Sequence, residues 1–353
     1  MLKSFRIVTL IAAFVTLAGF ILQPNQQFVG TSYVHTLLPA NAPLDPNSAA
    51  IVADMLANTP GGWSVSVSNY ASPLYFVTNE PTVTIKGARN FDPTFDSWGK
   101  VPLETILNPV PLPGNFLPAS GSDASAIICR MATNECWELW YAQLTGGTTV
   151  NSAGQTVPEW SAGWGGHMTN VSSNPGYFLE DPRYPGWHWD SSASSIPQML
   201  FMTIEEQRLG VIRHPLAFGT TCTARGHVFP AQRDDGWSDT CLPKEGMIFR
   251  LPASLNIDAL PLTPYAKMIA KAIQNYGMVL VDTTGGGFSS IAAEAQGNNY
   301  HPGWSDVYWD PGGILGCPPP PTPHYSCWPD NGPGHLLDGF PFNQLQVIQP
   351  RSQ

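Results

Sequence analysis

Two acidic side chains, Asp123 and Glu138, lie within a short predicted hairpin at residues 123–142 and are of the type that general acid–base chemistry uses. Each strand of the hairpin also carries a cysteine, and a disulfide between Cys129 and Cys136 would fix the register of the two strands. Because side chains alternate along a strand, one face then collects Asp123, Ser125, Ile127, Glu138 and Trp140. This face is the best candidate site in the chain.

Glycoside hydrolysis needs two carboxylates on opposite sides of the scissile bond. In the predicted register Asp123 and Glu138 are separated by roughly 13 Å at Cα, at about 3.3 Å per strand residue. That is long for a retaining pair, at about 5 Å, and also for an inverting pair, unless the side chains lean together. For Asp123, a role in capping a turn is favoured over catalysis. For Glu138, catalysis and pairing with an arginine are equally favoured, because burying a carboxylate between two tryptophans costs free energy without a purpose.

His214 is the third candidate for catalysis, and it lies in an apolar predicted strand beside Arg213. As a base or a metal ligand it would need a carboxylate or carbonyl on its other ring nitrogen, and Glu138 is the predicted neighbour. The alternative is a core histidine with satisfied hydrogen bonds. No cofactor is predicted, although a divalent metal held by Asp123, Glu138 and His214 stays open.

Tryptophans in the middle of the chain are the candidates for substrate binding. Aromatic faces suit the C–H surfaces of sugars, and such sites combine apolar walls with a few polar groups. Trp140 and Trp164 are the leading pair, with Arg233 placed to orient a sugar hydroxyl or carboxylate. The wider set is Trp140, Trp160, Trp164, Trp187 and Trp189, and the alternative is that these rings pack beneath a long loop.

The composition is typical of an extracellular, loop-rich β protein. Of 353 residues, 43% are hydrophobic and only 12% are charged, with 33 glycines and 35 prolines. The net charge is −10 with 16 Lys and Arg, and no basic run occurs. Nucleic acid is therefore not an expected partner, because its binding needs clustered cations. A neutral polysaccharide or cell-wall glycan suits this charge better than a polyuronate.

The first 25 residues predict an export signal or an N-terminal anchor, because Lys3 and Arg6 precede an apolar run from Ile7 to Leu22. We expect residues 26–353 to form one secreted domain, with membrane contact only through an uncleaved N-terminal segment. Export permits disulfides. Six cysteines allow fifteen pairings, of which the simplest joins nearest neighbours: Cys129 with Cys136, Cys222 with Cys241, and Cys317 with Cys327.

Many short strands separated by turn residues predict a mainly β fold, a single sandwich or jelly-roll-like domain with a few short peripheral helices. Helices are expected at 49–58, at 204–209 with a capping box, and at 264–276. Strands are expected at 211–218 and 227–231, among others. Residues 144–190 are predicted to be a long connection.

Eight motifs in order resemble an uncharacterised group of secreted, β-rich proteins that is common in actinobacteria and related soil bacteria. The likeness covers about residues 43–348. The eight motifs begin at Gly121 (GSDAS), Trp137 (WELW), Trp160 (WSAGWGG), Gly210 (GVIRHPL), Val228 (VFPAQRDDG), Gly246 (GMIFRL), Tyr276 (YGMVLVD) and Gly339 (GFPFNQLQV). The resemblance implies secretion and a shared fold, and it supplies no chemistry. The group usually has histidine where this chain has Ser125, and alanine where it has Pro215.

The sequence therefore supports two hypotheses about a secreted polysaccharide-interacting protein. In the first it is a glycan hydrolase or lyase, with Glu138 as acid or base, His214 as the second proton-transfer group and Asp123 orienting the substrate. In the second it is a non-catalytic carbohydrate-binding or surface-structural protein held together by disulfides. Ser125 in place of a histidine favours binding, whereas a water-filled cleft that unites Glu138 and His214 would favour catalysis.

Overall fold

The computed structural model describes residues 28, 30–67, 70–87, 103–180, 182, 193–295 and 336–350. Four of the residues singled out by the sequence lie outside these ranges: Trp187, Trp189, Cys317 and Cys327. The predicted export segment also lies outside them. Within the described residues the protein is built mainly of strands in four sheets, so the predicted mainly β fold with a few short helices is confirmed.

The largest sheet has six strands in the order β1-β14-β11-β13-β12-β15. Its strands are β1 (Trp63–Ser66), β11 (Leu216–Thr220), β12 (Ile248–Arg250), β13 (Met278–Thr283), β14 (Ser289–Ala292) and β15 (Gln346–Val347). The pairs β1–β14 and β11–β13 are parallel, and the other pairs are antiparallel. The predicted strand at 211–218 begins only at Leu216.

Two helices cover one face of this sheet, α1 (Ser48–Ala57) and α5 (Pro264–Asn275). Helix α5 begins where the sequence predicted, because the Thr263 side chain accepts a hydrogen bond from the Ala266 amide and Pro264 needs no donor at the first helical position. Alternation along the strands sorts the core into two layers. The side chains that face the helices include Leu216, Phe218, Met278 and Leu280.

A second sheet of four strands, in the order β10-β7-β6-β2, carries the predicted hairpin. Its strands are β2 (Leu74–Phe76), β6 (Ala126–Arg130), β7 (Glu135–Trp140) and β10 (Trp164–Thr169). The predicted register is confirmed, since Ile127 lies opposite Glu138 and Cys129 lies opposite Cys136, to which it is disulfide-bonded.

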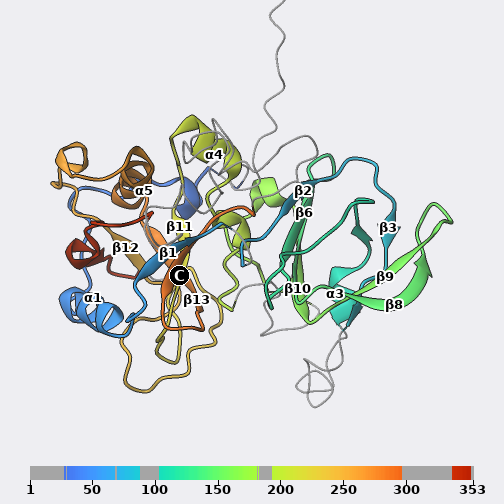
Figure 1. The fold of residues 1–353 in the computed structure, drawn as a ribbon, viewed down its shortest axis with the longest axis horizontal. Helices are drawn as coiled ribbons and strands as arrows, with labels where there is room; N and C mark the ends of the chain where they lie inside the picture. The colour runs from blue at the N-terminus through green and yellow to red at the C-terminus, as the bar shows by residue number, and fades with distance from the viewer. Residues whose placement is uncertain are drawn as a thin grey trace, which may run out of the picture.

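The two sheets lie side by side (Figure 1), and a core that they share fixes how they lie relative to each other. From the hairpin, Ile127, Cys129 and Cys136 belong to the same buried cluster as Ala217, Val279 and Val281 of the six-stranded sheet. The opposite face of the hairpin, with Ile128, Trp137 and Leu139, packs in a third cluster under α3 (Leu103–Leu107). The hairpin is thus buried on both faces along most of its length.

Smaller elements complete the fold. Two further sheets join β3 (Thr82–Val83) with β5 (Val110–Pro111), and β4 (Lys86–Gly87) with β9 (Thr156–Ala162) and β8 (Gln143–Val150). The remaining helices of the described residues are α4 (Ile204–Leu209) and the short 3₁₀ turns Tyr33–His35, Val171–Ser173, Gln198–Leu200, Ile257–Ala259 and Phe342–Gln344. No helix among the described residues is long and apolar enough to cross a bilayer.

Two expectations about local structure were wrong. Part of the predicted connection at 144–190 forms the strands β8, β9 and β10. Its Thr, Val and Trp residues favour strands more strongly than its glycines oppose them. The glycines lie at a register shift and at close contacts between strands. The predicted strand at 227–231 is a turn instead. Pro230 has no N–H group to donate to a strand ladder, which works against a regular strand here.

Candidate functional site

Glu138 is fully buried between the two large sheets, with none of its surface exposed. One carboxylate oxygen, Oε1, accepts a hydrogen bond of 3.1 Å from the backbone amide of Met199, which belongs to the 3₁₀ turn Gln198–Leu200. Strand neighbours on either side, Ile127 and Gly166, enclose it further. The side chain therefore supports the packing of a loop, and a polysaccharide has no route to it within the described residues.

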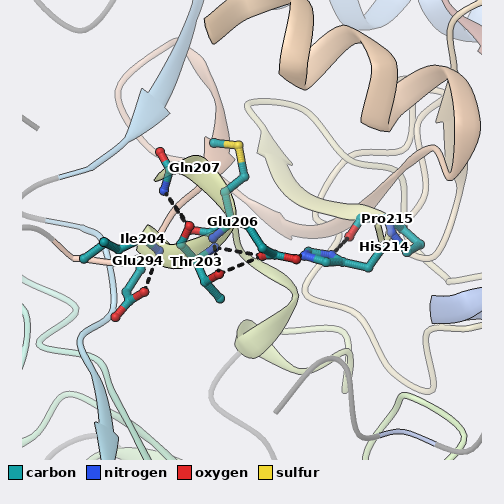
Figure 2. Close-up of polar contacts among 8 residues, drawn as sticks. Thr203, Ile204, Glu206, Gln207, His214, Pro215 and Glu294 are labelled. Carbon is teal, nitrogen blue, oxygen red and sulfur yellow. Dashed lines mark hydrogen bonds and ion pairs between the residues drawn. The ribbon is translucent and has the colours of Figure 1, made fainter. Parts of the chain in front are cut away.

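His214 is also buried, with 2% of its side chain exposed, and its ion-pair partner is Glu206 rather than the predicted Glu138 (Figure 2). The imidazole Nε2 lies 3.1 Å from Oε2 of Glu206, and Nδ1 lies 2.7 Å from the backbone oxygen of Pro215. Both ring nitrogens thus face oxygen acceptors, an arrangement that the doubly protonated imidazolium satisfies.

The position of Glu206 follows from the capping of helix α4. Thr203 and Glu206 form the predicted capping box, in which Oε2 of Glu206 accepts hydrogen bonds from the amide and the hydroxyl of Thr203. The same oxygen meets His214, so one carboxylate both caps the helix and neutralises the imidazolium. The sequence pattern predicted the cap and missed the ion pair.

The pH dependence of stability provides a test of this pair. Although burial opposes both charges, Glu206 holds the pKa of His214 above its ordinary 6.5, and His214 and Thr203 hold the pKa of Glu206 below 4.5. The stabilisation from the raised pKa of His214 is complete below pH 6.5 and is lost as the pH rises above that value. The stabilisation from the lowered pKa of Glu206 is complete above pH 4.5 and is lost as the pH falls below that value. We expect urea unfolding to show maximal pair stabilisation between these limits, and a wild-type profile parallel to that of His214→Gln would contradict it.

Four of the six predicted catalytic and binding residues do come together, at the end of the four-stranded sheet where β7 ends and β10 begins. Trp140, the last residue of β7, lies directly opposite Trp164, the first residue of β10. The guanidinium carbon of Arg233 lies 4.8 Å from the ring centroid of Trp164, and the Trp140 side chain hydrogen-bonds to Asp123. We call these four residues the Trp140–Trp164 platform; all four are partly exposed.

The backbone bends where the hairpin meets this platform. Ala124 and Tyr141 have φ of 40° and 57°, so the regular pairing stops and the chain turns. The Asp123 carboxylate can then reach Trp140, and partial burial raises its pKa. Gly163 lies against the Trp140 ring, since a Cβ there would come within 3.1 Å of ring atom Cζ3. A side chain at this position would displace the indole.

Sequence analysis missed two further polar sites. His167 stacks on Trp137 with ring centroids 4.4 Å apart, and its Nε2 lies 3.1 Å from Glu135. These contacts cross from β10 to β7, so they can be predicted only once the pairing of these two strands is known. Burial lowers the pKa of His167. Glu245, a fully buried acid in contact with the loop that the second disulfide closes, belongs to no chemical motif in the sequence.

The chain matches no protein-family model, no curated protein and no solved structure. The resemblance to the secreted actinobacterial group therefore stays a prediction. Within the described residues, no group of three or more His, Cys, Asp or Glu side chains is placed to hold a metal ion. Two disulfides join described residues, Cys129–Cys136 and Cys222–Cys241; both are predicted nearest-neighbour pairs, and they are compatible with an extracellular protein. Fold and site together define a mainly β, disulfide-bonded protein with a partly exposed aromatic platform.

Proposed function

We propose that this protein is secreted and binds polysaccharide through the Trp140–Trp164 platform without cleaving it. The observation that carries the proposal is the contrast between the platform and the two acid–base candidates. Trp140, Trp164 and Arg233 are partly exposed; the two tryptophans lie opposite each other in the sheet, and Arg233 contacts Trp164. Glu138 and His214 are buried and bonded to protein groups.

The chemistry of the platform suits a sugar ring. Two indoles held opposite each other on neighbouring strands offer apolar faces to pyranose C–H groups. Arg233 and Asp123 add a donor and an acceptor beside them, which are the few polar groups that orient a ligand in an apolar site. Because the whole chain carries a net charge of −10, a neutral glycan avoids the repulsion that a polyuronate would meet.

Tryptophan substitutions in the platform test the proposal. We expect the oxidised wild-type protein to be retained on at least one insoluble neutral polysaccharide from a panel of cell-wall glycans. Trp140→Ala and Trp164→Ala should each weaken retention roughly thirtyfold, as the loss of a binding hot spot of about 2 kcal/mol does. Depletion of protein from solution over a range of polysaccharide concentrations gives the affinities.

Trp237→Ala is the matched control, because Trp237 is 58% exposed and lies outside the platform. It should bind as the wild type does. Equal weakening by all three variants would mean non-specific adhesion of exposed indoles. Release of reducing ends that Glu138→Gln abolishes would replace binding with hydrolysis and restore the catalytic hypothesis. No retention on any polysaccharide would refute the proposal.

A further inference from the structure

A fully buried acid, Glu245, lies directly behind the loop that supplies Arg233 to the platform. This loop, residues 222–241, is closed by the Cys222–Cys241 bond, and we call it the disulfide loop. The backbone oxygen of Glu245 accepts a hydrogen bond of 2.9 Å from the Val228 amide, and Oε1 accepts one of 3.3 Å from the Asp235 amide. Glu245 therefore holds the loop at two points.

The surroundings of this carboxyl group are acidic. The carboxyl groups of Glu245 and Asp235 are in hydrogen-bond contact, and Asp282 of β13 adds a further negative charge. The other oxygen of Glu245, Oε2, is buried and accepts no hydrogen bond from any N–H or O–H group of the described residues. Burial, followed by Asp235 and Asp282, raises the pKa of Glu245 to about 11. Two carboxyl groups in hydrogen-bond contact need a proton on one of them.

Charged groups nearby do not change this balance. Asp234 pairs with His227 at 3.0 Å, and Arg225 pairs with Asp239 at 3.1 Å, both in the disulfide loop itself. Lys244 precedes Glu245 in the chain, and its ammonium group lies toward Gly226. No ion pair of Glu245 with a basic side chain occurs within the described residues.

We propose that Glu245 is a neutral carboxylic acid that donates a hydrogen bond to Asp235, and that this bond positions the disulfide loop. Asp235 also ties the loop to the six-stranded sheet, because its Oδ1 accepts a hydrogen bond of 2.9 Å from the Thr283 hydroxyl on β13. Gln232 anchors the other side of the same segment through its backbone N–H, which donates a hydrogen bond of 3.0 Å to the backbone oxygen of Ser194. Arg233 lies between these two anchors. Glu245 is thus a positioning residue for Arg233, a consequence for binding that rests on the proposed function.

Two substitutions separate the proton from the shape of the side chain. Glu245→Gln keeps a donor and an acceptor, whereas Glu245→Ala removes both. In hydrogen-exchange NMR we expect the Asp235 amide, which donates to the side chain, to exchange at least tenfold faster in Glu245→Ala and at the wild-type rate in Glu245→Gln. The Val228 amide donates to the backbone of residue 245 and serves as the internal control, so its protection should persist.

The pH profile tests the protonation state itself. Because the pKa of Glu245 is raised in the fold, its contribution to stability is complete only below the ordinary value of 4.5 and is lost as pH rises toward about 11. Wild type and Glu245→Gln should therefore unfold alike near pH 5. Between pH 5 and pH 9 the unfolding equilibrium of the wild type should rise relative to Glu245→Gln, by up to tenfold per pH unit.

Parallel pH profiles for wild type and Glu245→Gln would overturn the proposal. So would an increase in the melting temperature with millimolar Ca²⁺ that Glu245→Gln abolishes, since a bound cation would then replace the proton. On a retaining polysaccharide, Glu245→Gln should bind as the wild type does and Glu245→Ala at least tenfold more weakly. Both exchange and pH readouts are independent of any glycan, so they stand even if the binding proposal fails.

Discussion

Replacing Glu206 by alanine is expected to lower the free energy of unfolding by about 3–5 kcal/mol, the usual cost of removing one member of a buried ion pair. The imidazolium of His214 would lose its counter-ion at a position where 2% of the side chain is exposed. The amide of Thr203 would lose its capping partner in the same step. Urea unfolding at pH 5.5, with the disulfides intact, measures the change.

Glu205→Ala is the matched control, because Glu205 also lies in the first turn of helix α4 but has no part in the capping box. It should change the stability by less than about 0.5 kcal/mol, as surface substitutions do. The double substitution Glu206→Ala with His214→Ala completes the cycle, and we expect strongly non-additive costs. A loss below about 1 kcal/mol for Glu206→Ala would show that the pair is worth no more than an exposed one.

The second large effect is expected at Gly165, in the strand that carries Trp164. A Cβ at this position would collide with the backbone oxygen of Glu138 and lie 3.1 Å from the Leu107 side chain. Backbone cannot move aside as a side-chain tip can, so β10 would have to separate from β7. We expect Gly165→Ala to cost about 3 kcal/mol in urea unfolding, at the upper end for overpacking, and to weaken glycan retention with it.

Gly114→Ala is the control for this substitution, because a Cβ at Gly114 meets nothing within 4 Å. It should leave stability within about 0.5 kcal/mol of the wild type. Unchanged stability of Gly165→Ala would mean that the approach of β10 to β7 is looser than described. The spacing of Trp140 and Trp164 would then need another explanation.

Local signals in the sequence predicted much of the fold. The capping box at Thr203 and the Thr263-Pro264 pair placed two helices, and the cysteine pair at 129 and 136 gave the hairpin register. These features depend on residues close in the chain. The parallel pairs β1–β14 and β11–β13 join segments far apart, and no local pattern specifies such partners.

The candidate site divides in the same way. Alternation placed Glu138 on one face of the hairpin, but only the packing of the six-stranded sheet against that face shows that the carboxylate is buried. The contact of Arg233 with Trp164 joins the disulfide loop to the four-stranded sheet. The sequence identifies the two residues as types suited to sugar binding, but it does not specify that they meet. The sequence predicts Glu138 as the neighbour of His214, whereas the structure pairs His214 with Glu206, an acid that the sequence pattern assigns only to the helix cap.

The most direct measurement is an NMR titration that follows the indole N–H signals with a soluble oligosaccharide from a retaining polysaccharide. Assignment comes from the Trp140→Ala, Trp164→Ala and Trp237→Ala variants. We predict saturable shifts of the Trp140 and Trp164 signals, an unchanged Trp237 signal, and no cleavage of the oligosaccharide during the titration. Shifts confined to other indoles would place the binding surface elsewhere, and cleavage that depends on Glu138 would contradict a binding role without chemistry.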